Sequence, residues 1–488
     1  MNTAPTHLIF EQSVPGRRGC TLPKLTPAEA ACELRMPAKY MAAQPPELPE
    51  VSELDVVRHF TNLSRKNFSV DTHFYPLGSC TMKYNPKICE KIAALDGFAG
   101  LHPLLPQLRG GGMLTQGALE VLYETEHLLA EICGMDAMSL QPMAGAHGEL
   151  TGIMLIAAYH RERGNRKTKV LVPDSSHGTN PASAALAGYT VVTVPSGPDG
   201  CMDMQAFQAA LDDEVAAIMM TCPNTLGLFE RQIHEIADCA HAKDALLYYD
   251  GANLNALLGL CRPGDLGFDV VHINLHKTFA TPHGGGGPGS GPVGVKKALI
   301  PYLPTSLVVK RSDGTYALEY DLEKSIGYIA PFYGNFGVIL KAYAYLLLMG
   351  RDGLKAVSEN AVLSANYIKE KLKAHFDLPY DRTCMHECVF DAGRQAAKGV
   401  HAIDIAKALI DRGIHPPTVY FPLVVHEAIM IEPTETESKE ELDLFIDAMI
   451  AIAEQVKTDP SVFAAMPVTM PVTRLDETKA AKDMKFRV

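Results

Sequence analysis

Lys277 is the residue of this chain whose surroundings point most clearly to chemistry. It follows an apolar stretch at residues 270–274, and a glycine-rich run at residues 284–291 comes soon after it. At the end of a strand, in a dry pocket, an ammonium group is disfavoured, so the free amine can form a Schiff base. The adjacent His276 adds a second reactive side chain. The alternative is a surface lysine at the start of a loop, which is the usual state of a lysine taken at random.

Asp250 is the second candidate, because it also ends an apolar stretch, residues 245–249. It precedes Lys277 by about one strand–helix–strand unit, and neighbouring strand ends can bring both side chains into one pocket. A cofactor whose ring nitrogen must stay protonated needs a buried carboxylate beside it, which Asp250 can supply. The alternative role for Asp250 is an Asx turn or a helix N-cap.

Two further segments follow predicted strands. His177 can stack on a flat ring or relay protons near neutral pH, although a lone loop histidine is often only a polar surface residue. Residues 141–148 pass through the small residues Ala144, Gly145 and Ala146 into a predicted helix. The free backbone N–H groups at a helix start suit a phosphate group, but small residues are also common at ordinary strand-to-helix turns.

Alternating strands and helices must position these four segments. Short apolar runs predict the strands, and apolar residues at helical spacing predict the helices. The expected strands are residues 138–141, 170–172, 190–194, 216–220, 245–249 and 270–274, and the expected helices include 114–134, 149–162 and 230–242. This alternation is typical of an α/β fold with a mostly parallel sheet covered on both faces, and functional groups then collect at the carboxyl ends of the strands.

The pattern predicts three parts along the chain. Residues 1–95 form a proline-rich N-terminal arm followed by an active-site loop segment, and residues 96–330 form the large domain. Residues 331–488 form a smaller α+β C-terminal domain. Its expected elements are helices at about 334–374 and 439–456 and strands at 388–390 and 428–432.

Composition excludes several classes of protein. The 488 residues include 44 Lys and Arg against 56 Asp and Glu, a formal charge of −12, which argues against nucleic-acid or anionic-membrane partners. With 47% hydrophobic and 20% charged residues, the chain is ordinary globular protein rather than disordered. No apolar run approaches the ~20 residues that span a bilayer, and the first residues lack a targeting pattern, so we expect a cytoplasmic protein. The 11 scattered cysteines indicate reduced thiols.

Three other patterns carry less weight. Residues 284–289 satisfy a dinucleotide-binding glycine pattern only because they are nearly all glycine, and they do not open a helix. The spacing of Cys384 and Cys388 matches no zinc motif, so buried or loose thiols are favoured and no metal is expected. The acidic run at residues 432–437 suggests a solvated loop and a helix cap, with no evident chemical role.

The order of a phosphate loop, a histidine, an aspartate and a lysine resembles the large domain of fold type I pyridoxal-phosphate enzymes. Longer strings resemble the P-protein of the glycine cleavage system over nearly the whole chain: FYPLGSCTMKYNP at residues 74–86, the runs at residues 251–274 and 275–291, and IEPTETES at residues 431–438. The start, LIFEQSVPGRR at residues 8–18, is similar to the second subunit of the two-chain bacterial form. Cys261 and Cys388 stand where that family would be expected to have other residues.

This resemblance implies decarboxylation of glycine, with pyridoxal 5'-phosphate held as a Schiff base on Lys277 and the aminomethyl group transferred to the lipoyl group of H-protein. It implies P-protein subunit 1 as a partner in a heterotetramer. By the same resemblance, His177 stacks on the cofactor ring, and His276 and His283 handle protons or contact the cofactor. The remaining implied residues are Asn253 and Thr278 for cofactor binding, and Ser79, Cys80, Thr81 and Lys83 at the cofactor mouth.

Two alternatives remain open from the sequence. One is a stand-alone amino-acid decarboxylase or aminotransferase of the same fold, which would turn over a free amino acid without a lipoyl carrier. The other is a non-catalytic half that supports an active partner. The joint presence of Lys277, Asp250 and His177 argues against the second alternative.

Overall fold

A computed structural model describes residues 7–31, 36–44, 46–108, 111–284 and 287–483. The chain forms two compact units, one of residues 73–464 and the other of residues 1–72 with 465–488. Residues 73–95, which the sequence analysis grouped with the N-terminal arm, therefore lie in the same unit as the central sheet. Residues 465–488, which were expected in the C-terminal domain, are grouped with residues 1–72 instead.

A seven-stranded sheet forms the centre of the larger unit, with strand order β1-β7-β6-β5-β4-β2-β3. The strands are β1 Ala137–Ser139, β2 Lys169–Pro173, β3 Thr190–Val194, β4 Val215–Met220, β5 Leu246–Gly251, β6 Val270–Ile273 and β7 Val293–Val295. Strands β2 to β6 pair in parallel, whereas β7 pairs antiparallel with both β6 and β1. The predicted mostly parallel sheet is confirmed; the three-residue strand β7, with a central glycine, was missed.

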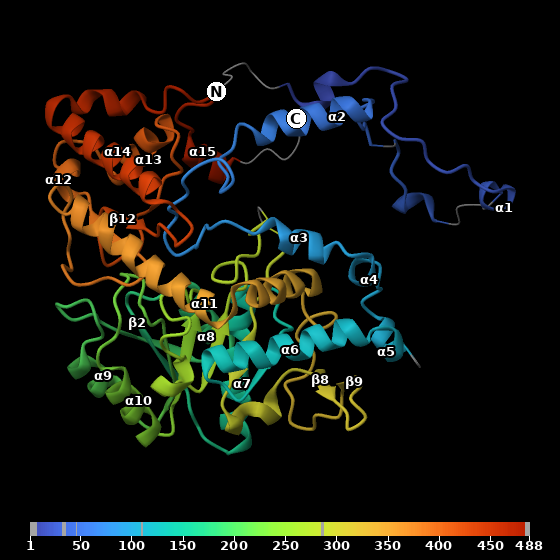
Figure 1. Cartoon of the computed structure of the whole chain (residues 1–488), viewed down its shortest axis with the longest axis horizontal. Helices are drawn as coiled ribbons and strands as arrows, with labels where there is room; N and C mark the ends of the chain where they lie inside the picture. Colours follow the sequence, from blue (N-terminus) through green and yellow to red (C-terminus); the bar gives the residue numbers. More distant parts are fainter. Residues whose placement is uncertain (1–6, 32–35, 45, 109–110, 285–286, 484–488) are drawn as a thin grey trace. The chain divides into compact units, whose positions relative to one another are not determined.

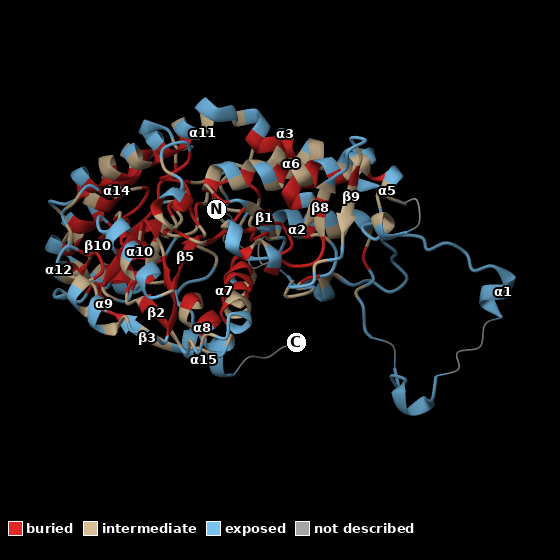
Figure 2. Cartoon of the chain, turned by 90° about the horizontal axis from the view of Figure 1, so that it is seen from below, coloured by how far each residue is buried: buried red, intermediate tan, exposed pale blue. Residues whose placement is uncertain are grey.

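Helices cover both faces of this sheet, and the strands lie among them in Figure 1. They include α6 Gln116–Cys133, α7 Gly145–Glu162, α8 Thr179–Leu186, α9 Met204–Ala210 and α10 Ile233–Ala242. Neighbouring residues of β5 join different apolar clusters: Leu247 packs in the cluster of Ile236 from α10, and Tyr248 in that of Ile153 from α7. All six residues of β4 and of β5 are buried, as the red strand β5 in Figure 2 shows. A strand covered on both faces reads as a continuous apolar run, which explains why the sequence revealed these strands.

The second half of the larger unit begins with α11, Phe336–Leu372, which breaks at Gly350, where φ is +59°. A three-stranded antiparallel sheet follows, with the order β10-β12-β11. Its strands are β10 Cys388–Asp391, β11 Thr418–Val419 and β12 Ala428–Ile431, and its helices are α12 Gly393–Ala396, α13 Ala402–Asp411 and α14 Lys439–Thr458. Leu77 forms an isolated antiparallel bridge with Ile431, which places the loop of residues 74–83 beside β12.

Shorter elements complete the larger unit: α3 Lys87–Ala93, α4 Asp96–Ala99, η3 Leu105–Gln107, α5 Gly111–Leu114, η4 Pro263–Leu266, η5 Lys297–Tyr302, the hairpin β8 Leu307–Lys310 and β9 Tyr316–Glu319, and η6 Pro460–Ala465, whose last residue lies in the other unit. None of the helices in the described ranges is long and apolar enough to cross a membrane.

The smaller unit consists of short helices joined by extended chain. Its elements are η1 Ile9–Gln12, α1 Pro27–Ala30, η2 Ala38–Tyr40, α2 Glu53–Ser64 and α15 Glu477–Lys482. Helix α2 starts with a reciprocal cap, in which Ser52 accepts the N–H of Asp55 and the Asp55 carboxylate accepts the N–H of Ser52. Among the described residues before Glu47, none is buried.

Candidate active site

A cavity of about 300 Å³ lies at the carboxyl ends of the parallel strands, where functional groups of such sheets collect. Lys277 and His276 line it just after β6, Asp250 lines it at the end of β5, and His177 lines it after β2. The complete lining is Ser79, Gly145, Ala146, Glu149, His177, Thr179, Thr221, Pro223, Asn224, Thr225, Asp250, Ala252, Asn253, Asn274, His276, Lys277, His386 and Glu387. The structure thus brings the four main predicted side chains together.

The start of α7 forms one wall of this cavity. Ala144 is extended, with φ −159° and ψ 167°, and the helix begins at Gly145. The first helical hydrogen bond runs from the N–H of Gly148 to the carbonyl of Ala144, so the N–H groups before it have no helical partner among the described residues and can serve a ligand. A Cβ on Gly145 would lie 2.6 Å from the side-chain amide of Asn274, so only glycine leaves Asn274 its place.

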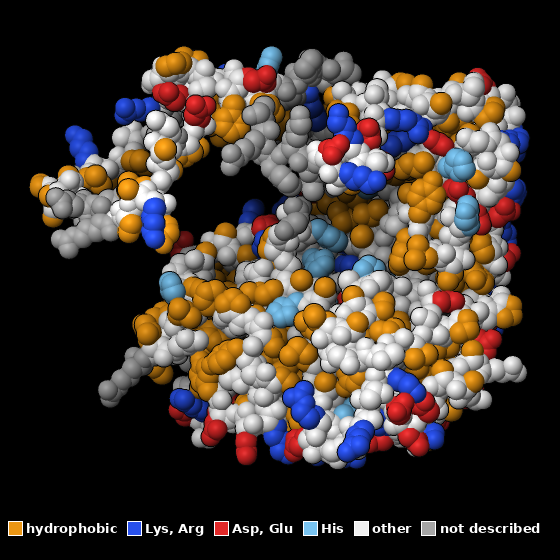
Figure 3. Space-filling model, turned by 180° about the vertical axis from the view of Figure 1, so that it is seen from behind, with side chains coloured by type: hydrophobic (Ala, Val, Ile, Leu, Met, Phe, Trp, Pro, Cys, Tyr) orange, Lys and Arg blue, Asp and Glu red, His pale blue; other side chains and the backbone are white. Residues whose placement is uncertain are grey.

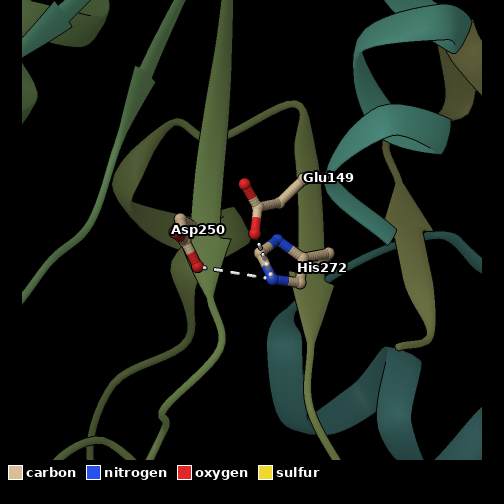
Figure 4. A group of neighbouring side chains, drawn as sticks. All are labelled: Glu149, Asp250 and His272. Atoms are coloured by element: carbon tan, nitrogen blue, oxygen red, sulfur yellow. Dashed lines mark ion pairs between the residues drawn. The ribbon is translucent and has the colours of Figure 1, made fainter. Parts of the chain in front are cut away.

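Asp250 is held in a buried polar cluster, drawn in Figure 4. Only 3% of the residue is exposed, and its Oδ1 accepts the N–H of Ala252 at 3.0 Å. Nε2 of His272 lies 3.4 Å from the same Oδ1 and 4.0 Å from Oε1 of Glu149. A buried carboxylate with this support can hold a proton on a ring nitrogen of a ligand in the cavity.

Burial lowers the pKa values of the histidines at the site, which favours their neutral forms. Burial lowers the pKa of His276 to about 3, helped by the charges of His283 and Lys277, and burial with Lys277 lowers the pKa of His283 to about 4. The two rings meet edge to face with centroids 5.1 Å apart. Burial also lowers the pKa of His177. Figure 3 shows histidine side chains gathered near the centre of one face of the molecule.

Two buried glutamates hold the loop of residues 74–83 in place. The N–H of Ser79 donates to Glu387 at 2.8 Å, and the N–H of Thr81 donates to Glu432 at 3.1 Å. Ser79 and Thr81 have φ values of 61° and 48°, a conformation that is costly for residues other than glycine, so these hydrogen bonds stabilise an unfavourable backbone. Glu432 also accepts the side-chain amide of Asn253 at 2.7 Å and the hydroxyl of Thr81 at 2.5 Å.

The expectation of a solvated acidic run at residues 432–437 is therefore wrong at Glu432, which is 0% exposed, and at Glu435, whose side chain is 8% exposed. Burial, followed by the charge of Glu432, raises the pKa of Glu387 well above its usual range. Glu387 and His386 line the cavity, as does Glu149, and sequence reasoning missed all three as site residues. Each of these contacts joins distant parts of the chain, so no local pattern marks them.

Six other predicted site residues are absent from the cavity lining. Thr81 is bound to Glu432, Ala144 is the N-cap residue of α7, and the hydroxyl of Thr278 accepts the N–H of Leu254 at 2.8 Å. Burial raises the pKa of the Cys80 thiol, and the adjoining His283 packs on His276. Lys83, finally, is buried in an ion pair with Glu435 at 2.7 Å. Residues 285 and 286 of the glycine-rich run lie outside the described residues.

Comparison with known proteins gives two family matches and close relatives of full length. Residues 23–323 match the family described as "Glycine cleavage system P-protein", and residues 357–463 match "Glycine dehydrogenase, C-terminal domain". A Bacillus licheniformis protein described as "Probable glycine dehydrogenase (decarboxylating) subunit 2" is 57% identical over 488 residues, 100% of this chain and 99% of the relative. A Caldanaerobacter subterraneus protein of the same description is 56% identical over 481 residues, 98% of each chain.

Solved structures agree on the fold. The crystal structure of glycine decarboxylase (P-protein) of the glycine cleavage system, in inhibitor-bound form, matches with a TM-score of 0.71 at 22% identity, over 86% of this chain and 93% of that one. Sphingosine-1-phosphate lyase of Burkholderia pseudomallei matches with a TM-score of 0.64 at 16% identity, over 88% and 96%. The fold and the site together define a pyridoxal-phosphate enzyme of fold type I. More narrowly, the chain belongs to the glycine cleavage system P-protein family.

The donors in the cavity fit pyridoxal phosphate. The free N–H groups at the start of α7 suit the phosphate, Asp250 suits the ring nitrogen, and Lys277 supplies an amine. Within the described chain, Oγ1 of Thr221, Oδ1 of Asn274 and Nδ1 of His276 are buried without hydrogen-bond partners. Unsatisfied polar atoms that line one cavity indicate a polar ligand, because burial without a partner is costly.

Proposed function

We propose that this chain decarboxylates glycine with pyridoxal phosphate bound at Lys277 and passes the aminomethyl group to the lipoyl group of H-protein. One observation carries the proposal: in a chain of the P-protein family, Lys277, Asp250 and the start of α7 line a single cavity. The relatives described as glycine dehydrogenase (decarboxylating) subunit 2 support glycine as the substrate.

The residues divide the work as follows. The bound cofactor supplies an electron-withdrawing ring that accepts the electron pair left when CO₂ departs. Lys277 provides the amine that binds the cofactor, and Asp250 holds the proton on the ring nitrogen. The N–H groups of Gly145 and Ala146 would hold the phosphate, and His177 would contact the ring. The close contact between Gly145 and Asn274 keeps the helix start directly against the strand end that carries Lys277.

Proton handling falls to neutral groups around Lys277. Nδ1 of His276 has no partner within the described chain, so a neutral His276 can exchange a proton with the reacting amine or the lipoyl sulfur. His283 packs against it and contacts the loop of residues 74–83. Burial raises the pKa of Glu387, which is held on Ser79, so its carboxyl group is a second candidate proton donor at the cavity wall. The same loop reaches the cavity through Ser79, and we assign the mouth of the site to this loop.

Other assignments also belong to this proposal. Asn253 lines the cavity and fixes Glu432, whereas Thr278 supports the site from behind by fixing the turn after β5. The description of the relatives as subunit 2 indicates a partner subunit 1. We propose a heterotetramer of the two subunits, with lipoylated H-protein as the third component, in the cytoplasm.

Glycine–CO₂ exchange with lipoylated H-protein tests the function, measured for the chain with and without subunit 1. The wild-type pair should exchange labelled CO₂ into glycine, and Lys277→Ala should abolish exchange. Lys297→Ala is the matched control, because Lys297 lies at the start of η5 and does not line the cavity. Turnover of a free amino acid without H-protein would favour a stand-alone decarboxylase. Full exchange without subunit 1 would contradict the two-subunit requirement.

A further inference from the structure

Glu149 is a buried carboxyl group beneath the cavity that the proposed mechanism leaves without a task. It lies on α7, its side chain is 6% exposed, and it lines the cavity. Figure 4 shows it pointing from α7 towards the same imidazole, His272, that Asp250 faces from β5. Its protonation state decides how it acts on the neighbouring residues that line the cavity.

The hydroxyl of Thr179 joins Glu149 to His177. Oγ1 of Thr179 lies 2.8 Å from Oε1 of Glu149 and 2.7 Å from Nδ1 of His177. The backbone N–H of Thr179 also points at Nδ1 of His177, at 3.3 Å, so this nitrogen is an acceptor and the imidazole carries its proton on Nε2.

A single hydroxyl proton cannot serve two acceptors. If Glu149 were ionised, Thr179 would donate to the carboxylate, and its oxygen lone pair would then face the lone pair of Nδ1 at 2.7 Å. A protonated Glu149 removes this conflict. Its own O–H donates to Oγ1 of Thr179, and the Thr179 hydroxyl is then free to donate to His177. With the backbone N–H of Thr179 directed at Nδ1 of His177, the geometry on this side favours a neutral carboxylic acid.

The other side of Glu149 leads to the same state. Asp250 and Tyr248 face this region from β5, His272 from β6, and Lys277 from the segment after β6. The Tyr248 hydroxyl lies 2.7 Å from Nδ1 of His272, which leaves only Nε2 of His272 to face both carboxyl groups.

Two negative charges around one buried, neutral imidazole are unfavourable, and Asp250 has the backbone hydrogen bond that favours its ionised form. Burial and the charge of Asp250 raise the pKa of Glu149 to about 8, although Thr179 and Lys277 act in the opposite direction.

We propose that Glu149 is a positioning residue that stays protonated in the working enzyme and, through Thr179, fixes His177 with its proton on Nε2. The neutral acid also leaves Asp250 as the single negative charge under the ring. This inference rests on the proposed place of His177 at the cofactor. When Glu149 loses its proton, Thr179 turns to the carboxylate, and His177 loses its hydroxyl donor.

The first test is independent of catalysis. Infrared difference spectra of the full-length chain without added cofactor compare wild type with Glu149→Gln across pH, and protonated carboxyl groups common to both cancel. We expect a carboxylic-acid carbonyl band in the wild type that disappears as the pH rises through about 8 and is missing in the variant. Glu162→Gln, on the exposed end of the same helix, should leave the band in place. A wild type that lacks this band at pH 6 would overturn the proposal.

The second test uses the cofactor-loaded enzyme and separates donor geometry from simple packing. An amide at position 149 can still donate to Thr179, whereas Glu149→Leu cannot. We expect Glu149→Gln to lower glycine–CO₂ exchange less than threefold and to lose the wild-type change of cofactor absorbance near pH 8. Glu149→Leu should lower exchange at least tenfold. Equal loss in both variants, or an unchanged absorbance titration in Glu149→Gln, would overturn the positioning role. Loss of exchange in the wild type with the infrared band intact would instead count against the proposed function.

Discussion

Lys83 and Glu435 form an ion pair that is removed from solvent. Their side chains are 1% and 8% exposed, and Nζ lies 2.7 Å from Oε1. The ammonium also donates to the Tyr345 hydroxyl at 3.3 Å and to Oδ1 of Asn255 at 3.4 Å. Burial alone would lower the pKa of Lys83, but the charges and hydrogen bonds of Glu435 and Tyr345 together outweigh burial, and the pKa is raised. The pair therefore stays ionised and ties the end of the loop of residues 74–83 to the segment after β12.

Replacement of Lys83 by Met should destabilise the protein strongly, because Glu435 then keeps only one donor from this network, the Asn255 amide at 3.1 Å. Loss of one partner of a buried pair costs about 3–5 kcal/mol of unfolding free energy. Glu435→Gln should have a similar cost. The double variant should lose clearly less unfolding free energy than the sum of the two single losses, because no buried charge is then left without its partner.

Urea unfolding followed by circular dichroism measures these differences. Lys439→Met is the matched control, since the Lys439–Asp443 pair is 68% and 40% exposed, and exposed pairs contribute less than about 1 kcal/mol. The reasoning is refuted if Lys83→Met costs no more than Lys439→Met, or if the two single costs add without coupling.

Three further predictions concern the site. Glu432→Gln should lower glycine–CO₂ exchange at least tenfold and lower the free energy of urea unfolding by about 1.5–3 kcal/mol, because the N–H of Thr81 loses a charged acceptor. An unaffected exchange rate would contradict this. Gly145→Ala should weaken cofactor binding at least tenfold in a fluorescence titration, because its Cβ would meet Asn274, while Gly117→Ala, with open space, should not. Folding raises the pKa of Glu149 from 4.5 to about 8, so the protonated group contributes to the free energy of unfolding at pH 4, and up to about 4 kcal/mol of that contribution is lost as the pH rises to 8. Glu149→Gln should remove this fall in stability with pH, measured as urea midpoints between pH 5 and 9.

The sequence predicts the parts of the site that depend on sheet topology. Lys277 and Asp250 each follow an apolar run, and in a parallel sheet the ends of such runs meet at one edge whatever the detailed packing. That is why both side chains line one cavity as expected, with His177 from the loop after β2. The start of α7 follows from the same rule, because the change from apolar alternation to small residues marks the turn between strand and helix.

Contacts between distant segments could not be predicted in this way. Glu432 looked solvated because an acidic run has no local sign of its partners, and those partners, Thr81 and Asn253, lie far along the chain. Glu149 sits inside a helix pattern, where a glutamate is usually a surface residue, and only the fold places it beside Asp250. Lys83 resembled a residue of the cofactor mouth, yet its ammonium is held by Glu435.

The central claim is that Lys277 is the lysine that binds the cofactor. Reduction of the cofactor-loaded chain with borohydride, followed by peptide mass spectrometry, tests it directly, because reduction makes the bond between amine and cofactor permanent. We predict the added phosphopyridoxyl mass on the peptide that contains Lys277, and none after addition of excess glycine before reduction. The same mass on Lys83, the buried lysine at the end of the loop of residues 74–83, or on no lysine at all, would contradict the account.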